Sequence, residues 1–158
     1  MAVDVGDALP DFDLETGGGG RLSAGALRGR RSVLYFYPKD DTSGCTLEAR
    51  EFTALIGEFA ERGVAVYGVS PDPVRSHDRF TAKCDIGFPL ISDPDKALCG
   101  AMGVWVEKSM YGRAYMGVER STFVIGPDGR VEKAWRKVKV PGHAAEVLGS
   151  VGGRPGPL

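Results

Sequence analysis

The sequence lacks a long hydrophobic run and an excess of charge of either sign. No apolar stretch approaches the roughly 18 residues that cross a bilayer, so the sequence does not predict a membrane protein. Lys and Arg number 20 and Asp and Glu number 21, which gives a net charge of −1. Binding to a nucleic-acid backbone requires a basic excess. We therefore expect neither a membrane nor a nucleic acid as a partner.

Cysteine and histidine are also scarce. Three cysteines in 158 residues are too few for a disulfide framework and fit working thiols in a reducing compartment. His77 and His143 do not pair with cysteines at the spacing of zinc ligands, and no glycine-rich nucleotide-binding motif occurs. No signal peptide is visible at the N-terminus. We expect a cytoplasmic protein without a metal or another cofactor.

The length predicts a single domain, which we place at residues 1–151. The last residues, 152–158, are rich in glycine and proline and are expected to form a disordered tail. Apolar runs at 32–37 and 64–69 predict strands that are covered on both faces, as in a parallel sheet. Between them, residues 52–59 carry apolar side chains on one helix face, so the three segments predict a right-handed βαβ unit.

The rest of the chain predicts further short elements. Three more helices are expected, at 74–83, 96–102 and 143–148, and short strands near 12–14 and at 89–91. Strands at 122–125 and 130–135 flank a Pro-Asp-Gly turn and predict a hairpin. Residues 103–120 are expected to be irregular. Met110, Tyr111, Tyr115 and Met116 are expected to pack into the protein, and the alternative is that they form a wall of the active site. The fold class is therefore α/β and thioredoxin-like, with a central mixed sheet flanked by helices and an N-terminal extension.

The polar stretch that follows the first apolar run carries the informative chemistry. Cys45 comes after a buried strand and opens a helix, where free N–H groups and the helix dipole favour the reactive thiolate. Asp40 and Asp41 oppose a negative charge there, so a cation from elsewhere in the chain is needed. An inert buried cysteine is the alternative. Position 42 is threonine, so the Cys-x-x-Cys pair of a dithiol exchanger is absent.

Residues 36–48, Phe-Tyr-Pro-Lys-Asp-Asp-Thr-Ser-Gly-Cys-Thr-Leu-Glu, resemble the active-site signature of the peroxiredoxins. The closer match is the bacterioferritin-comigratory, or PrxQ, subfamily. The similarity covers nearly the whole chain. Other segments that resemble this subfamily lie at 6–12, 68–72, 88–93, 103–108 and 117–125.

This resemblance implies a role for each residue of the motif. Cys45 would be the peroxidatic cysteine, which attacks the terminal peroxide oxygen. The hydroxyl of Thr42 would hold the peroxide, and Pro38 would shield the thiolate from water. Arg120 would stabilise the thiolate and the leaving oxygen, and Glu48 would orient Arg120. Without the motif, we would expect Arg120 to be a solvated surface arginine and Glu48 to be a carboxylate on an exposed helix face.

The chain departs from the subfamily at one position. Many members carry a resolving cysteine five residues after the peroxidatic one, where this chain has Arg50. Other members carry it on the helix after the second strand, so the resemblance favours Cys84 as the resolving cysteine. Cys99 lies in a short apolar segment and is expected to be structural. A one-cysteine mechanism that uses an external thiol is the alternative.

The resemblance thus implies a thiol-dependent peroxidase. It would reduce hydrogen peroxide and organic hydroperoxides through a sulfenic acid and an intramolecular disulfide, and thioredoxin or a similar dithiol would recycle it. The resemblance favours a monomer, with a dimer as the alternative. Two other functions stay open: a peroxide sensor that a partner protein reads, and a non-catalytic binding module of the thioredoxin fold.

Overall fold

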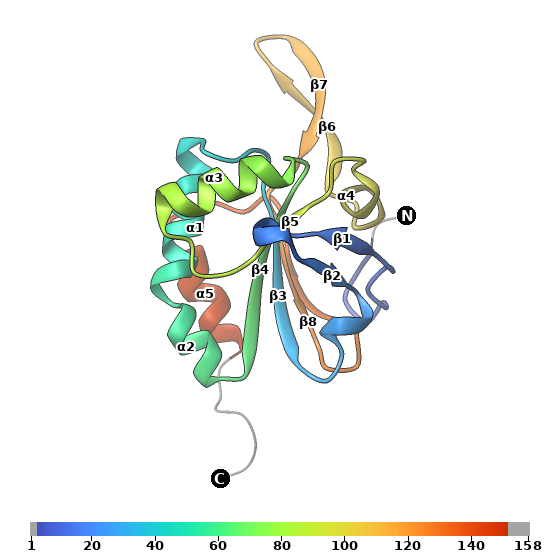
Figure 1. Ribbon diagram of the computed structural model, residues 1–158. Coiled ribbons are helices and arrows are strands. Elements are labelled where there is room, and N and C mark those ends of the chain that lie inside the picture. The colour runs from blue at the N-terminus through green and yellow to red at the C-terminus, as the bar shows by residue number, and fades with distance from the viewer. Residues whose placement is uncertain (1–2, 152–158) are drawn as a thin grey trace.

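A five-stranded mixed sheet forms the centre of the structure, a computed structural model in which residues 3–151 are described (Figure 1). The strand order is β5-β4-β3-β8-β9. The bounds are β3 Arg31–Phe36, β4 Val64–Ser70, β5 Leu90–Ser92, β8 Ser121–Ile125 and β9 Val131–Trp135. β3, β4 and β5 are parallel, whereas β8 is antiparallel to both β3 and β9. The predicted thioredoxin-like fold is confirmed. The predicted tail, 152–158, lies outside the described residues.

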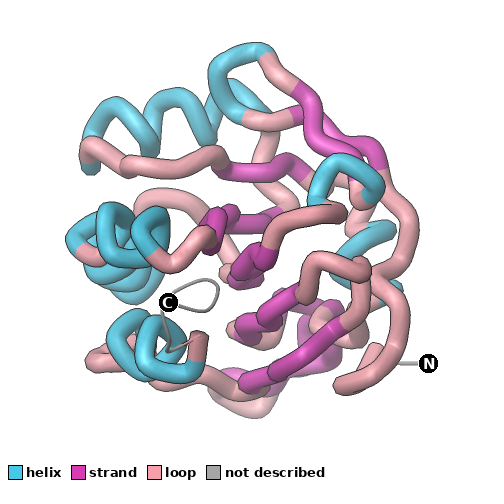
Figure 2. The backbone as a smooth tube through the Cα atoms, turned by 90° about the horizontal axis from the view of Figure 1, so that it is seen from below, coloured by secondary structure: helices cyan, strands magenta, loops and turns pink. Residues whose placement is uncertain are grey.

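Helices cover both faces of this sheet, and four of them lie on the same side (Figures 1 and 2). These four are α1 Ser43–Ala54, α2 Ile56–Glu61, α3 Val74–Cys84 and α5 His143–Ser150. The short helix α4, Ala97–Ala101, lies on the other side with the N-terminal segment. Side chains alternate along β3, so Val33 and Tyr35 join the core under the four helices while Leu34 and Phe36 join the core on the opposite face. A strand buried on both faces needs a continuous apolar run.

The predicted helix at 52–59 is broken in the structure. α1 ends at Ala54 and α2 begins at Ile56, and Leu55 between them departs from helical geometry, with φ −104° and ψ 4°. Phe52 and Phe59 are nevertheless both buried in the same core. The apolar spacing therefore predicted which side chains face the sheet, and it did not predict the break.

The expectation of an irregular segment at 103–120 is wrong. β6 Trp105–Met110 and β7 Arg113–Val118 form an antiparallel hairpin that projects from the body of the molecule (Figure 1). Its side chains are mostly exposed, so the sequence has no alternation of buried and exposed residues to mark the strands. The side chains expected to pack are 44–97% exposed: Met110, Tyr111, Tyr115 and Met116.

Shorter elements complete the described part. β1 Asp13–Glu15 is the expected N-terminal strand, and it pairs with β2 Arg21–Ser23, which the sequence did not predict. Single 3₁₀ turns lie at Gly17–Gly19 and Gly25–Leu27. Among residues 3–151, none of the helices has the length and apolar character that a membrane span requires.

Candidate active site

The candidate residues come from three parts of the chain that meet at one edge of the sheet. β3 ends at Phe36, and the loop that follows leads directly into α1 and Cys45. β8 is antiparallel to β3 and pairs Ser121 with Phe36, so Arg120, just before β8, is placed at the same edge. The parallel neighbour β4 ends there too, with Val69 beside Phe36. The topology alone therefore brings Arg120 to the loop before Cys45.

Cys45 lies in the first turn of α1 and is only 1% exposed. Its sulfur accepts a hydrogen bond from Nη2 of Arg120 at 3.4 Å. The N–H groups of this first helical turn have no partner within the helix and add a partial positive charge. The thiol therefore lies between a helix N-terminus and a guanidinium and is almost completely shielded from solvent. Both of these groups favour a thiolate.

Arg120 also contacts Glu48, through a hydrogen bond from Nη1 to Oε1. Burial lowers the pKa of Arg120, but the negative charges of Glu48 and Cys45 and their hydrogen bonds outweigh that effect and raise it. The guanidinium is therefore a permanent cation at the sulfur. It is the cation from elsewhere in the chain that was expected beside Cys45.

Glu48 lies one helical turn after Cys45 and is 1% exposed. Burial raises its pKa from 4.5 to about 7, against the opposing effect of Arg120. Oε2 of this carboxyl has no hydrogen-bond partner within residues 3–151, so one oxygen binds the arginine while the other is desolvated. Glu48 thus holds Arg120 in place, and the burial of its own carboxyl costs free energy because the group loses its hydration.

Two further residues lie near Arg120, and the sequence did not predict this for either of them. Gly44 has no side chain, and a Cβ there would lie 3.2 Å from Nη2 of Arg120. Lys108 of β6 is half-buried, and its pKa is lowered by burial and by the charge of Arg120, against smaller opposing effects of Glu119 and Cys45. Its segment, 103–108, was noted only as part of the resemblance.

Thr42 and Pro38 lie on the loop that leads to Cys45. Thr42 precedes α1 with extended backbone, φ −92° and ψ 159°, and its side chain is exposed. Its hydroxyl donates to the carbonyl oxygen of Lys39 at 3.0 Å. The lone pairs of the hydroxyl stay available to an incoming ligand. Pro38 is half-buried directly after β3. Within residues 3–151, the sulfur of Cys45 is hydrogen-bonded to Arg120 and not to Thr42.

Cys84 and Cys99 are free thiols at two different places. Cys84 is the last residue of α3, 9% exposed, and belongs to the same core cluster as Cys45. Cys99 is fully buried in the core on the other face of the sheet. Burial and the neighbouring Asp93 raise the pKa of the Cys99 thiol well above its ordinary value. The described residues contain no cluster of three potential metal ligands.

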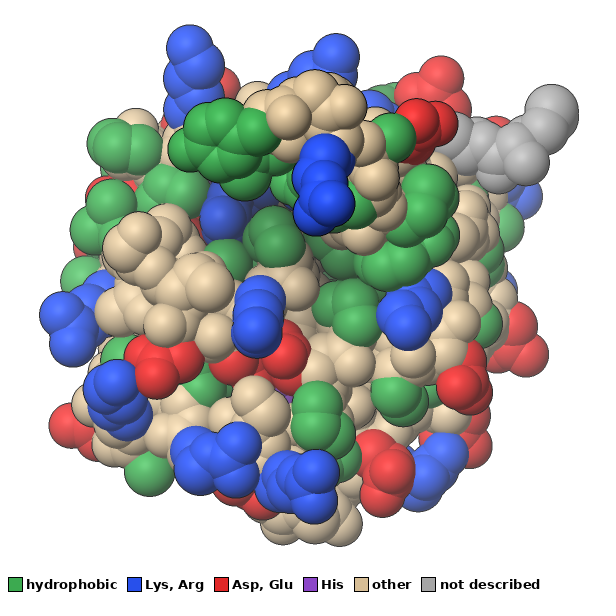
Figure 3. All heavy atoms as spheres, turned by 90° about the horizontal axis from the view of Figure 1, so that it is seen from above, with side chains coloured by type: hydrophobic (Ala, Val, Ile, Leu, Met, Phe, Trp, Pro, Cys, Tyr) green, Lys and Arg blue, Asp and Glu red, His purple; other side chains and the backbone are tan. Residues whose placement is uncertain are grey.

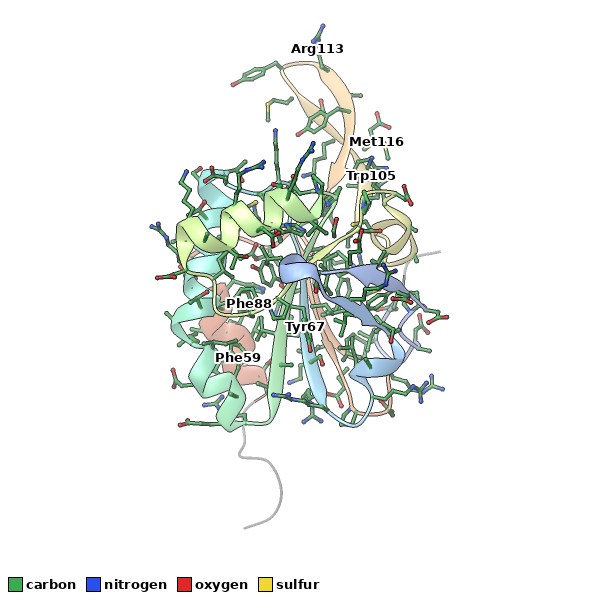
Figure 4. The ribbon with its side chains drawn as sticks, viewed as in Figure 1. Phe59, Tyr67, Phe88, Trp105, Arg113 and Met116 are labelled. Carbon is green, nitrogen blue, oxygen red and sulfur yellow. The ribbon has the colours of Figure 1, made fainter. Side chains whose placement is uncertain are left out.

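The projecting hairpin stands over this end of the molecule. From above, hydrophobic side chains gather around it, while Lys and Arg side chains are spread over the rest of the face (Figure 3). Trp105 lies at its base and Arg113 at its tip (Figure 4). A surface hollow of about 550 Å³ is lined only by residues near the tip, 110–115. The hollow does not include Cys45 or Arg120.

The sequence matches a known family and close relatives. A family model described as the AhpC/TSA family matches residues 5–134. Peroxiredoxin Bcp of Xanthomonas campestris is 51% identical over 149 residues, which cover 94% of this chain and 93% of that protein. Peroxiredoxin Bcp of Bacillus subtilis is 43% identical over 148 residues, which cover 94% of each. The similarity therefore extends well beyond the motif around Cys45.

The backbone also matches solved structures. A structure of the bacterioferritin comigratory protein of Xanthomonas campestris, from work on its alkyl peroxide reduction activity, has a TM-score of 0.88 and 49% identity, and the match covers 94% of this chain and 97% of that one. A structure of PrxQ of Xylella fastidiosa has a TM-score of 0.91 and 44% identity, with 96% of both chains covered. Fold and sequence point to the same relatives.

Proposed function

Because the chain belongs to the AhpC/TSA family, and within it to the bacterioferritin-comigratory peroxiredoxins, we propose that Cys45 is the residue with which it reduces hydroperoxides. Peroxiredoxins are thiol peroxidases, and this chain is one. The contact that carries the assignment to Cys45 is the 3.4 Å hydrogen bond from Arg120 to its sulfur. Neither Cys84 nor Cys99 has such a contact among the described residues.

The first step is a displacement at oxygen. The Cys45 thiolate attacks the terminal oxygen of a hydroperoxide, an S–O bond forms and the O–O bond breaks. Both electrons of the O–O bond leave with the second oxygen as hydroxide or alkoxide, which takes a proton from water. The sulfur is oxidised to a sulfenic acid, Cys–SOH.

Arg120 and Thr42 are proposed to serve this step in different ways. Arg120 stabilises the thiolate before the attack and the developing negative charge on the leaving oxygen during it. Thr42 would hold the peroxide through its hydroxyl, which is exposed at the start of α1. Pro38 would shield the sulfur from water, and Glu48 would act only through Arg120.

The second step is proposed to join Cys45 to Cys84. The Cys84 thiol attacks the sulfenic sulfur, a disulfide forms, and water leaves with the sulfenic oxygen. The segment after Cys84 packs on the C-terminal end of α1, where the N–H of Gly87 donates to Oγ1 of Thr53 at 3.2 Å. Thr53 lies eight residues beyond Cys45, which is about 12 Å along a helix. A disulfide requires Cα atoms within about 7 Å. We expect the first turn around Cys45, or the segment around Cys84, to unwind before the bond forms.

A dithiol donor would complete the cycle by reducing the disulfide with two electrons. Thioredoxin or a similar protein is the proposed donor, because exchange proceeds by thiolate attack on a disulfide sulfur. If an external thiol reduces the sulfenic acid directly, Cys84 is not needed. If the disulfide persists and a partner protein reads it, the chain serves as a sensor.

Stopped-flow mixing with hydrogen peroxide or an alkyl hydroperoxide tests the assignment. The reduced wild-type protein should consume one equivalent rapidly, and Cys45→Ser none, because a serine hydroxyl stays protonated at neutral pH. Arg120→Ala should react about 10²–10³ times more slowly, whereas the control Arg113→Ala, at the hairpin tip, should match the wild type. Fast consumption by Cys45→Ser would refute the assignment. Sustained turnover with thioredoxin would distinguish an enzyme from a sensor.

A further inference from the structure

A buried carboxylate that the proposed chemistry does not use lies on the loop between Pro38 and Thr42. Asp40 is 6% exposed. Its two oxygens accept three hydrogen bonds: from the Tyr37 hydroxyl at 2.6 Å, from Ser76 Oγ at 2.8 Å and from Nδ1 of His77 at 2.7 Å. Ser76 and His77 belong to α3, the helix that ends at Cys84. Asp40 therefore ties the loop before Cys45 to another helix.

His77 is completely buried, and both of its ring nitrogens are engaged. Nε2 lies 3.0 Å from the carbonyl oxygen of Ile91, which only accepts, so this nitrogen must carry a hydrogen. One proton is then shared between Nδ1 and the Asp40 carboxylate, and the pair is neutral as a whole. With no accessible nitrogen, His77 has no means to act as a base on a substrate. Its role is to hold Asp40.

The backbone around Asp40 is fixed from a second direction. The N–H of Asp40 donates to Oδ2 of Asp72 at 2.8 Å, and Ser70 donates to the same oxygen at 2.7 Å. Asp72 follows β4, so the loops after two neighbouring parallel strands are joined here. The next residue, Asp41, has the left-handed φ of 62° that a side chain rarely adopts. A strained backbone of this kind persists only where its surroundings hold it.

We propose that Asp40 and His77 are positioning residues, whose buried pair holds the loop Lys39–Thr42 against α3 and so sets the Thr42 hydroxyl and the Cys45 sulfur in the geometry that a peroxide requires. This inference rests on the proposed function of Cys45. A misplacement of about 1 Å can cost 10²-fold in rate, so the loop must be held to less than that.

Asp40 could affect the reaction through its charge or through the position of the loop, and these two explanations predict different results for a pair of matched variants. Asp40→Asn is nearly isosteric and leaves a neutral pair with a neutral His77, so it changes geometry without changing the net charge. Asp41→Asn removes one full negative charge from the neighbouring position, whose exposed side chain has hydrogen bonds only with Lys83 among the described residues. Asparagine also tolerates the left-handed backbone at this site. If the negative charge near Cys45 controls the peroxide rate, Asp41→Asn should have the larger effect. If the position of the loop controls it, Asp40→Asn should have the larger effect.

The test measures two reactions of Cys45 in each reduced variant. Stopped-flow kinetics with hydrogen peroxide reports on the complete site, and alkylation by iodoacetamide reports on the thiolate alone. We expect Asp40→Asn to slow the peroxide reaction about tenfold or more without slowing alkylation, and Asp41→Asn to leave the peroxide rate within about twofold of the wild type. A variant that is merely damaged would not separate the two reactions in this way.

Ser76→Ala provides a milder version of the same test. It removes one of the three donors to Asp40 and leaves the pair and the helix in place, so it remains informative if Asp40→Asn does not fold. Its peroxide rate should fall between those of the wild type and Asp40→Asn, again with unchanged alkylation. An Asp40→Asn protein that folds and reacts as fast as the wild type, or an unchanged peroxide rate in Ser76→Ala, overturns the positioning role alone. A wild-type Cys45 without a fast peroxide reaction overturns the proposed function, and the positioning role with it.

Discussion

Gly44 is the residue immediately before Cys45, and the absence of a side chain there makes room for Arg120. A Cβ would lie 3.2 Å from Nη2, which is closer than ordinary van der Waals contact. Arginine is a flexible residue, but this one is fixed by hydrogen bonds to Glu48 and Cys45. The absence of a side chain at Gly44 therefore affects where the guanidinium of Arg120 lies relative to the sulfur of Cys45.

We predict that Gly44→Ala slows the reaction with peroxide by about tenfold, because the guanidinium must shift away from the sulfur and 1 Å can cost 10²-fold. Gly57→Ala is the matched control, since Gly57 also lies in a helix and has no atom within 4 Å of its Cβ position. Single-turnover kinetics of both variants would test this. Equal rates for Gly44→Ala and the wild type would show that Arg120 adapts without loss.

The β6–β7 hairpin turns through Tyr111 and Gly112, which have φ values of 53° and 77°. Two central residues with positive φ define a type I′ turn, for which Asn-Gly is a favoured sequence. Tyr111 is 97% exposed, so its ring contributes almost no packing to offset the strain. The hairpin is formed by strand pairing in spite of its turn sequence.

Tyr111→Asn should therefore stabilise the hairpin locally by about 1 kcal/mol, the approximate cost of a left-handed backbone for an ordinary side chain. Amide hydrogen exchange within β6 and β7 should slow in the variant. Ser109→Asn introduces the same residue at an exposed strand position and should not slow exchange. Unchanged exchange in Tyr111→Asn would mean that the turn does not limit the opening of the hairpin.

Helix α3 connects both proposals, since it carries His77 on its buried face and Cys84 at its end. After one equivalent of peroxide, peptide mapping of the wild type should recover a Cys45–Cys84 disulfide. Cys84→Ser should instead accumulate a sulfenic acid that dimedone traps, because no second thiol reaches Cys45. Cys99→Ala should behave as the wild type, since Cys99 lies on the other face of the sheet. A Cys45–Cys99 link would contradict the assignment, as would normal recycling of Cys84→Ser by thioredoxin.

The stability of the whole molecule should depend on pH through Glu48. Burial raises the pKa of this carboxyl from 4.5 to about 7, so the folded state holds a proton that the unfolded state loses. Its contribution to stability is complete below about pH 4.5 and is lost as pH rises to about 7. The ionised form is the less stable one even though it faces Arg120, because desolvation has the larger effect on its pKa.

Glu48→Gln removes this titration and keeps an oxygen for Arg120. Urea unfolding should show the wild type losing about 2–3 kcal/mol relative to Glu48→Gln between about pH 5 and pH 8, at 1.36 kcal/mol per pKa unit. Glu58→Gln, an exposed carboxyl on α2, should follow the wild-type curve at both pH values. Parallel curves for the wild type and Glu48→Gln would show that Arg120 keeps Glu48 ionised throughout.

The organisation of the chain into one domain at 1–151 and its monomeric state stay predictions. The two apolar cores on the faces of the central sheet are covered by helices on one side and by α4 with the N-terminal segment on the other. The exposed large apolar side chains are Val5, Leu47, Met110, Tyr111, Tyr115 and Met116. Most of them lie on the projecting hairpin.

The sequence by itself determined the central strands, most of the helices and the candidate for the reactive cysteine. Continuous apolar runs marked β3 and β4, because a strand covered on both faces has no polar side to interrupt the pattern. The apolar spacing at 52–59 likewise marked the helical face that packs on the sheet. The position of Cys45 after a buried strand and at a helix start was also a local feature, and so was the need for a distant cation.

The sequence placed Arg120 and Glu48 at Cys45 only through the family resemblance, and the tertiary structure supplies the physical reason. Arg120 lies 75 residues away in the chain and reaches the sulfur because β8 pairs antiparallel with β3. The use of Gly44 as space for that arginine, and the pairing of Asp40 with His77, likewise join segments that share no local pattern. The exposed hairpin escaped prediction because hydrophobic periodicity records burial, and a hairpin that projects into solvent buries little.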